Sequence, residues 1–317
     1  MAEFIILLVS LVIIVIASDK LIDSSSKIAK FYGVPTFIIG VSIIAFGTSA
    51  PELVVGILSS IQKTNQLSYG NIVGSCINNT GLILGVSSLI LTVAVSAKIM
   101  NKEMLMLIGV DLILLAMSFN GGLSRIDGII LLALGLAFII YLIKGATSGD
   151  EESTEKIEKT QLRKHWLIVI FGLIGLIASG HLIVDSSQKI AASFGIDQSA
   201  IGLTLVALGT TMPELMTSIA AARRKEDDMI LGNIIGSNIF NILIVLGVSS
   251  AIHPISINFI DPFNIYRSLF IDVGIMIFLT FLIYVIMRSR KKISWLSGIL
   301  LLTIYTLYMI KQIYFIV

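Results

Sequence analysis

Residues Ala45–Leu53 read AFGTSAPEL, and residues Ala207–Leu215 read ALGTTMPEL, 162 positions further along the chain. Both copies place a glutamate directly after a proline inside a long apolar run, where neither residue is favoured. Pro51 has no N–H to donate, and its ring clashes with the carbonyl group of Gly47, a residue that itself weakens a helix. The motif therefore predicts a broken helix that releases backbone carbonyl groups at membrane depth, twice in one chain.

The composition excludes a soluble globular protein. Of the 317 residues, 56% are hydrophobic and only 13% are charged. Apolar runs close to the roughly 20 residues needed to cross a bilayer recur along the whole chain. The runs are continuous and do not alternate with period two, which disfavours a β-barrel. The composition thus predicts an all-α integral membrane protein.

The apolar runs predict ten transmembrane helices. They cover Glu3–Tyr32, Pro35–Gln62, Tyr69–Ser96, Glu103–Phe119, Ile126–Lys144, Trp166–Phe194, Asp197–Arg223, Met229–His253, Ser268–Met287 and Trp295–Phe315. We interpret the first run as a helix rather than a signal peptide, because Glu3 stands where a basic residue belongs.

The two halves of the chain are repeats of one another. At the same constant offset, GNIVGSCINN (Gly70–Asn79) matches GNIIGSNIFN (Gly232–Asn241). Five helices per half is an odd number, so the second copy must enter the membrane upside down. The sequence therefore predicts two inverted five-helix repeats. They are residues 1–144, with a motif block at 35–88, and residues 166–317, with a motif block at 197–250, joined by a linker at 145–165.

The distribution of basic residues predicts the orientation. If the N-terminus lies outside the cell, 17 of the 22 Lys and Arg residues fall on the cytoplasmic side, as the positive-inside rule requires. We therefore expect a multi-pass protein of the cell membrane with both termini outside and the 145–165 linker in the cytoplasm. Inverted repeats with broken helices at matching positions are typical of secondary transporters.

The repeated motif supplies an all-oxygen set of candidate ligands. Thr48 and Ser49 lie four and three residues before Glu52, on one face of a regular helix. Released carbonyl groups, hydroxyl groups and a carboxylate suit hard cations such as Na⁺ and Ca²⁺. Two glutamates brought together across a pseudo-two-fold axis would repel each other unless cations or protons neutralised them. That need for charge compensation is the physical basis for ion exchange.

A second pair of helices carries polar residues at helical spacing. Ser75 and Asn79 are four residues apart, as are Ser237 and Asn241, so each pair presents oxygen atoms from one face. Glycines near both pairs permit close approach between helices.

These motifs, GTSAPEL with GNIVGSCINN and GTTMPEL with GNIIGSNIFN, resemble the two α-repeats of the cation/calcium exchanger superfamily, especially its microbial sodium/calcium exchangers. The resemblance implies an antiporter that exchanges Na⁺ for Ca²⁺ by alternating access through a site at the bilayer midplane. It implies no enzymatic activity and no cofactor, since Na⁺ and Ca²⁺ are the transported ions. It also implies that the first and sixth helices are long and oblique, and slide over a core formed by the second, third, seventh and eighth helices.

The resemblance also assigns ligands to the transported cations. They are Glu52 and Glu214 as central acids, backbone carbonyl groups at Thr48, Thr210, Ala45 and Ala207, hydroxyl groups at Ser49, Ser75, Thr211 and Ser237, and the amides Asn79 and Asn241. Asn241 stands where potassium-dependent members, and some microbial exchangers, have an aspartate. Its neutral amide removes one titratable charge, which argues against coupling to K⁺. Thr211 stands where serine is common, and its methyl group is expected to tighten the external sodium position.

Several alternatives stay open at this point. Within the transporter class they are exchange of Ca²⁺ for H⁺ and exchange of another divalent cation, and the rival from another class is a cation channel. Asp111 and Asp272 also fall in apolar runs, but no GxGD follows either one, which disfavours an aspartyl intramembrane protease. Asp272, near a helix end, is expected to touch water. The expected partners are the two cations and the lipid bilayer, with no nucleic acid, and one chain is expected to suffice for transport.

Overall fold

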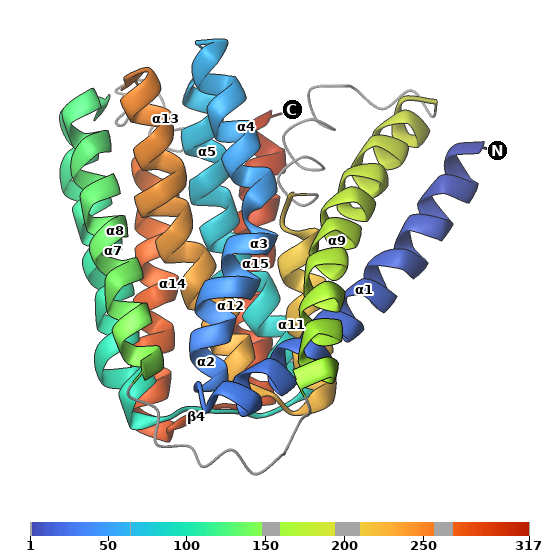
Figure 1. The fold of residues 1–317 in the computed structure, drawn as a ribbon. Coiled ribbons are helices and arrows are strands. Elements are labelled where there is room, and N and C mark those ends of the chain that lie inside the picture. The colour runs from blue at the N-terminus through green and yellow to red at the C-terminus, as the bar shows by residue number, and fades with distance from the viewer. Residues whose placement is uncertain (1, 64, 148–158, 194–209, 257–268, 317) are drawn as a thin grey trace.

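The structure is a computed structural model that describes residues 2–63, 65–147, 159–193, 210–256 and 269–316. Long helices cross the molecule side by side, and the N-terminal end of α1 and the C-terminal end of α15 lie at the same end of the bundle (Figure 1). The helix α8 ends, and α9 begins, at the opposite end.

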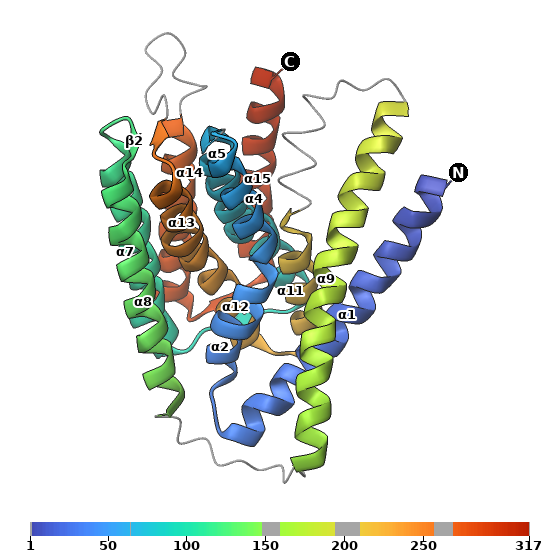
Figure 2. The ribbon, with the colours of Figure 1, turned by 45° about the horizontal axis from the view of Figure 1, so that its top comes forward.

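The helices α1 (Ala2–Tyr32) and α9 (Lys159–Ser193) are the longest of the described part, with 31 and 35 residues. They run obliquely and lean away from the other helices toward the end that holds the termini (Figures 1 and 2). Their contact has its own small apolar core, which includes Leu21 and Leu176, and Gly172 lets the two backbones approach closely. The expectation of two long, oblique helices is therefore confirmed.

The first proline motif breaks its helix as predicted. The predicted span Pro35–Gln62 consists of α2 (Thr36–Ile39), a π-helical turn η1 (Gly40–Ile44), α3 (Ala45–Thr48) and α4 (Ala50–Ile61). The segments before and after residue 49 are bent by 44°. In the second motif, α11 (Met212–Arg224) begins with Pro213 in its first turn, and the residues before Thr210 lie outside the described part.

Two spans at the centre of the molecule carry π-helical segments. The first is α5 (Asn65–Ile77), η2 (Asn78–Ile83) and α6 (Leu84–Ile90); the second is α12 (Asp227–Phe240), η4 (Asn241–Leu246) and α13 (Gly247–Ile252). In their apolar windows, 78% and 94% of the residues are buried, against 22–39% in the other single-helix spans. These two spans therefore form the core. Single π-helical turns within α-helices are frequent at functional sites.

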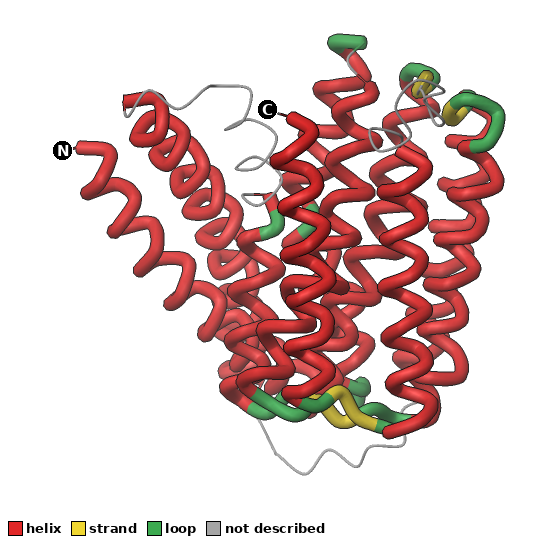
Figure 3. Tube along the Cα trace, turned by 180° about the vertical axis from the view of Figure 1, so that it is seen from behind, coloured by secondary structure: helices red, strands yellow, loops and turns green. Residues whose placement is uncertain are grey.

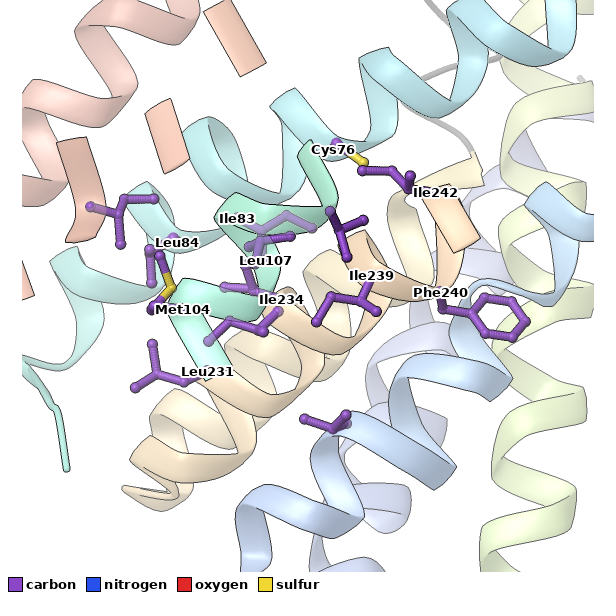
Figure 4. Close-up of a cluster of buried hydrophobic side chains, with 14 of the residues drawn as sticks. Cys76, Ile83, Leu84, Met104, Leu107, Leu231, Ile234, Ile239, Phe240 and Ile242 are labelled. Carbon is purple, nitrogen blue, oxygen red and sulfur yellow. The ribbon is translucent and has the colours of Figure 1, made fainter. Parts of the chain in front are cut away.

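The remaining helices surround this core. They are α7 (Met104–Ser118), preceded by η3 (Ile99–Glu103), then α8 (Arg125–Thr147), α14 (Leu269–Arg290) and α15 (Trp295–Ile316). Figure 4 shows apolar side chains of η2, α6 and α7 packed against those of α12, among them Leu107 and Ile234. Many large apolar side chains on α1, α8 and α9 are exposed, as expected for surfaces that face lipid.

Two short antiparallel strand pairs join the halves at opposite ends of the bundle (Figure 3). At one end β1 (Val93–Ala94) pairs with β4 (Lys292–Ile293), and at the other β2 (Gly122–Leu123) pairs with β3 (Ile255–Ser256). The predicted helix Tyr69–Ser96 is therefore too long, because the chain leaves the helix at Leu91 to form β1.

The bounds of the two predicted helices beside the linker also need correction. The helix α8 continues to Thr147 and α9 begins at Lys159, so helix occupies both ends of the predicted 145–165 linker. Among the described residues, six helices are long and apolar enough to cross a membrane, or seven if the bent pair that ends at Ile61 counts as one span.

Candidate functional site

The two glutamates of the repeated motif are both buried. Glu52 lies in the first turn of α4 and Glu214 in the first turn of α11, and each is 1% exposed. A proline in the same first turn suits a helix start, and the helix N-terminus favours a negative charge. The two carboxylates are close enough to repel each other electrostatically. The structure therefore brings together two acids that belong to separate copies of the motif, one in each half of the sequence.

Hydroxyl groups from both halves surround the carboxylates. The Ser49 hydroxyl donates a hydrogen bond of 2.9 Å to Oε1 of Glu214, and Thr48 lies beside the same carboxylate. Glu52 is contacted by the Ser75 hydroxyl, at a long 3.5 Å from Oε1, and by the Thr210 side chain. Each acid thus interacts with the segment that precedes the other acid in the opposite half.

Several buried oxygen atoms of the candidate ligands have no hydrogen-bond partner within the described part of the chain. They are Oε2 of Glu52, Oε2 of Glu214, Oγ of Ser237, Oδ1 of Asn79 and Oδ1 of Asn241. The elements that carry them are packed together, since α4 contacts η4 and α11 contacts both η2 and α12. Buried polar atoms almost always have partners, so this group of oxygen atoms indicates a binding site for a positively charged ligand.

Two other candidate ligands are already engaged by protein groups. The Ala45 carbonyl oxygen accepts the Ser49 N–H at 3.0 Å and the Thr48 hydroxyl at 3.3 Å. The prediction that this carbonyl group is released from the helix is therefore wrong for Ala45. The Thr211 hydroxyl accepts a hydrogen bond of 3.2 Å from Nδ2 of Asn78. Ala207 lies outside the described residues.

Three asparagines near the site were not singled out from the sequence. Asn233 accepts a contact of 3.4 Å from the Thr48 hydroxyl and donates to the Glu214 carbonyl group at 3.3 Å. Asn238 accepts a hydrogen bond of 2.9 Å from the Asn79 amide, and Asn78 contacts Thr211 as described above. All three stand inside the GNIVGSCINN and GNIIGSNIFN motifs. The sequence did contain a signal for them, because asparagine is mostly exposed in proteins and is unusual within apolar runs.

The composition of the site fits a hard cation. Within the described residues, no group of three or more His, Cys, Asp or Glu side chains lies close enough to hold a metal ion. A cation at this site would therefore be bound by two carboxylates together with neutral hydroxyl, amide and carbonyl oxygen atoms, which are the ligands that Na⁺ and Ca²⁺ accept.

Two aspartates in apolar helices, Asp111 and Asp272, interact with residues that are not among the candidate ligands. Asp272 is 9% exposed and pairs with Lys311 at 2.9 Å and with Gln312 at 2.8 Å, so its charge is compensated within the protein. Asp111 is 1% exposed and lies beside the Thr280 side chain.

Comparison with known proteins gives a consistent set of relatives. Residues 2–144 and 164–314 match the family model described as "Sodium/calcium exchanger protein". The chain is 35% identical over 257 residues to the inner membrane protein YrbG of Escherichia coli, covering 78% of this chain and 79% of the relative. It is 34% identical to the uncharacterized membrane protein MJ0091 of Methanocaldococcus jannaschii, covering 94% of both, and 29% identical to the sodium/calcium exchanger MaX1 of Methanosarcina acetivorans, covering 98% and 99%.

Solved structures of the sodium-calcium exchanger NCX_Mj are similar over almost their whole length. The structure soaked with 10 mM Na⁺ and 10 mM Sr²⁺ has a TM-score of 0.84 at 33% identity and covers 97% of both chains. The structure soaked with zero Na⁺ and Ca²⁺ has a TM-score of 0.85 at 32% identity and covers 97% of both chains.

Proposed function

Because the chain belongs to the sodium/calcium exchanger protein family, we propose that this multi-pass membrane protein is an antiporter that exchanges Na⁺ for Ca²⁺. The observation that carries the proposal is the pair of buried acids, Glu52 and Glu214, which contact hydroxyl groups of the first half, Ser49 and Ser75, and the Thr210 side chain of the second half. Two buried carboxylates at close range are costly unless positive charge neutralises them. One Ca²⁺ or several Na⁺ would supply that charge, and competition between them couples the two fluxes.

In the proposed site the twelve candidate ligands divide into three groups. The acids are Glu52 and Glu214; the hydroxyl ligands are Ser49, Ser75, Thr211 and Ser237; the remaining oxygen atoms come from Asn79, Asn241 and the backbone at Ala45, Thr48, Ala207 and Thr210. The unpartnered oxygen atoms of Asn79, Asn241 and Ser237 support this assignment. The Ala45 carbonyl group would first have to give up one of its present hydrogen bonds.

Alternating access between two inverted five-helix repeats is part of the proposal. The strand pairs support the inverted repeat: β1 follows the α5–α6 span and pairs with β4, whereas β3 follows the α12–α13 span and pairs with β2, at the other end of the bundle. The separate apolar core of α1 and α9 supports their movement as one unit over the rest of the helices. Ten spans follow if residues 1–144 and 166–317 each contribute five.

An ion-pair cluster between the C-terminal half of α1 and the end of α11 supports a proposal about which face is closed. Arg224, the last residue of α11, contacts Asp19 through two hydrogen bonds of 2.9 Å and Asp23 through a third of 2.9 Å. Next to it, the Ser26 hydroxyl donates to Oε1 of Glu226 at 2.6 Å. We call these contacts the α1–α11 latch. The repeat counterparts of Asp19 and Arg224 are His181 and Gln62, which do not reproduce the ion pair.

The latch lies at the end of the bundle where α8 ends and α9 begins, and we propose that this end is cytoplasmic, with both chain termini outside the cell. The basic residues of the linker region and of the loops beside it support this orientation. In the proposed cycle the structure represents a state that is closed to the cytoplasm, and a single chain in the cell membrane completes the cycle.

The experiment that tests the function is Ca²⁺ uptake into proteoliposomes under imposed gradients. An outward Na⁺ gradient is expected to drive Ca²⁺ uptake against its own gradient, a K⁺ gradient is expected to add nothing because Asn241 is neutral, and a pH gradient alone is expected to drive none. Uptake driven by protons instead of sodium would favour exchange of Ca²⁺ for H⁺. Downhill flux alone, with no coupled uphill movement, would favour a channel.

A further inference from the structure

A hydrogen bond between two buried amides joins the halves next to the site. Nδ2 of Asn79, in η2, donates to Oδ1 of Asn238, in α12, at 2.9 Å, and both residues are 1% exposed. Neither an acid nor a hydroxyl group takes part in this contact. Asn238 is not one of the candidate ligands, and it adjoins Ser237, which is one.

The contact decides which way the Asn79 amide faces. A carboxamide has an NH₂ group that only donates and an oxygen atom that only accepts. Because the NH₂ group of Asn79 is bound to Asn238, its oxygen atom is turned away from Asn238, and Oδ1 has no partner within the described residues. A buried oxygen atom that is held in place and left free is suited to a cation.

The other half of the chain has no equivalent of this contact. At the offset that relates the two repeats, Asn79 corresponds to Asn241, and Asn238 corresponds to Cys76. A thiol is a poor acceptor compared with an amide oxygen, and Cys76 lies among the apolar side chains of the core (Figure 4). Accordingly, neither Nδ2 nor Oδ1 of Asn241 has a partner among the described residues.

We infer that Asn238 is a positioning residue for cation binding: it holds the Asn79 amide with its oxygen atom toward the cation, whereas the Asn241 amide can rotate to present either atom. The inference rests on the proposed function, because it takes Asn79 and Asn241 as ligands of the transported ion. The two amides therefore play different roles, although the sequence repeat makes them look alike. Asn79 is a fixed ligand, and Asn241 adapts to the ion that is bound.

We estimate the loss of Ca²⁺ affinity expected without Asn238 from the behaviour of metal sites in general. Removing a group that orients a metal ligand typically weakens metal affinity about 10–100-fold. Since a fixed oxygen atom contributes its affinity without reorganisation, loss of Asn238 should raise the Ca²⁺ concentration needed for half-maximal binding by about this factor. The maximal exchange rate should change much less, because Asn238 forms no hydrogen bond with either acid in the described part of the structure.

The test compares substitutions at the two equivalent positions of the repeats, Asn238 and Cys76. Asn238→Cys gives the second half the residue that the first half carries, and Asn238→Ser is a smaller variant in case the first fails to fold; Cys76→Ala is the matched control. The readout is stabilisation of the purified protein against heat as Ca²⁺ is added, together with the KM and maximal rate of exchange. We expect a weaker apparent Ca²⁺ affinity in both Asn238 variants and an unchanged affinity in Cys76→Ala.

Wild-type affinity in a folded Asn238 variant would overturn the inference. If neither variant folds, a structure of the wild-type protein with Ca²⁺ decides. Oδ1 of Asn79 should then lie about 2.3–2.6 Å from the ion, with the bond to Asn238 intact. Broken or reversed pairing would contradict the inference. The binding readout needs no Na⁺ gradient, so Asn238 can be judged even if transport proves to be coupled to another ion.

Discussion

The α1–α11 latch gives the sharpest test of alternating access. Arg224→Gln removes the charge that pairs with Asp19 and Asp23, whose side chains are 47% and 28% exposed. Exposed ion pairs contribute about 0.2–1 kcal/mol each, so for two partly exposed pairs we expect about 1 kcal/mol in total. That energy corresponds to about a fivefold shift of population away from the state in which α1 and α11 are in contact.

The assay measures the distance between α1 and the C-terminal end of α11. In a Cys76→Ala background, spin labels at Lys20 and Arg223, both exposed, report this distance by pulsed electron paramagnetic resonance. We expect the wild type to populate mainly the short distance and Arg224→Gln to populate a longer one about fivefold more. High salt should move the wild type in the same direction, because it screens exposed charges.

Lys225→Gln provides the matched control, because it removes a neighbouring basic residue that forms no ion pair within the described part of the structure. Its distance distribution should match that of the wild type. Equal distributions in Arg224→Gln and the wild type, at low salt, would refute the idea that the latch biases the conformation.

Further predictions concern the site and the core. Glu52→Gln and Glu214→Gln should each abolish exchange while leaving the protein folded, and near-normal uptake in either variant would contradict the site. Ser49→Ala removes the donor to Glu214 and should raise the KM for Ca²⁺ by about tenfold, since a hydrogen bond to a charged group is worth about 1.5 kcal/mol or more; an unchanged KM would argue against a role at the site. Gly232→Ala would place a methyl group 2.6 Å from a backbone carbonyl oxygen of α2, whereas its repeat counterpart Gly70 has nothing within 4 Å. Overpacking of this kind costs about 1–3 kcal/mol, so the melting temperature should fall in Gly232→Ala and hold in Gly70→Ala.

Much of the site could be predicted because the chain repeats itself. The break at Pro51 follows from its missing N–H, and the placement of Glu52 beside Glu214 follows from two equivalent motifs packed against each other. Both are consequences of local sequence combined with the repeat.

Features that depend on contacts between distant parts of the chain could not be predicted from the sequence. The residues near Leu91 do not predict that the helix ends there. It ends because β1 pairs with β4, and β4 lies in the other half of the chain. The start of α9 at Lys159 was missed because polar residues such as Lys, Gln and Arg, read as linker, are also good helix formers. Likewise, the partner of the Asn79 amide depends on how two distant spans meet, so the sequence offered no reason to prefer Asn238.

The most direct measurement for the central claim is the position of a bound divalent cation, located by its anomalous X-ray scattering in crystals soaked with Sr²⁺. We predict one dominant peak between the Glu52 and Glu214 carboxylates, lost when Na⁺ is added in excess. A peak elsewhere in the bundle, or one that excess Na⁺ leaves unchanged, would contradict the claim that these two acids bind the exchanged ions.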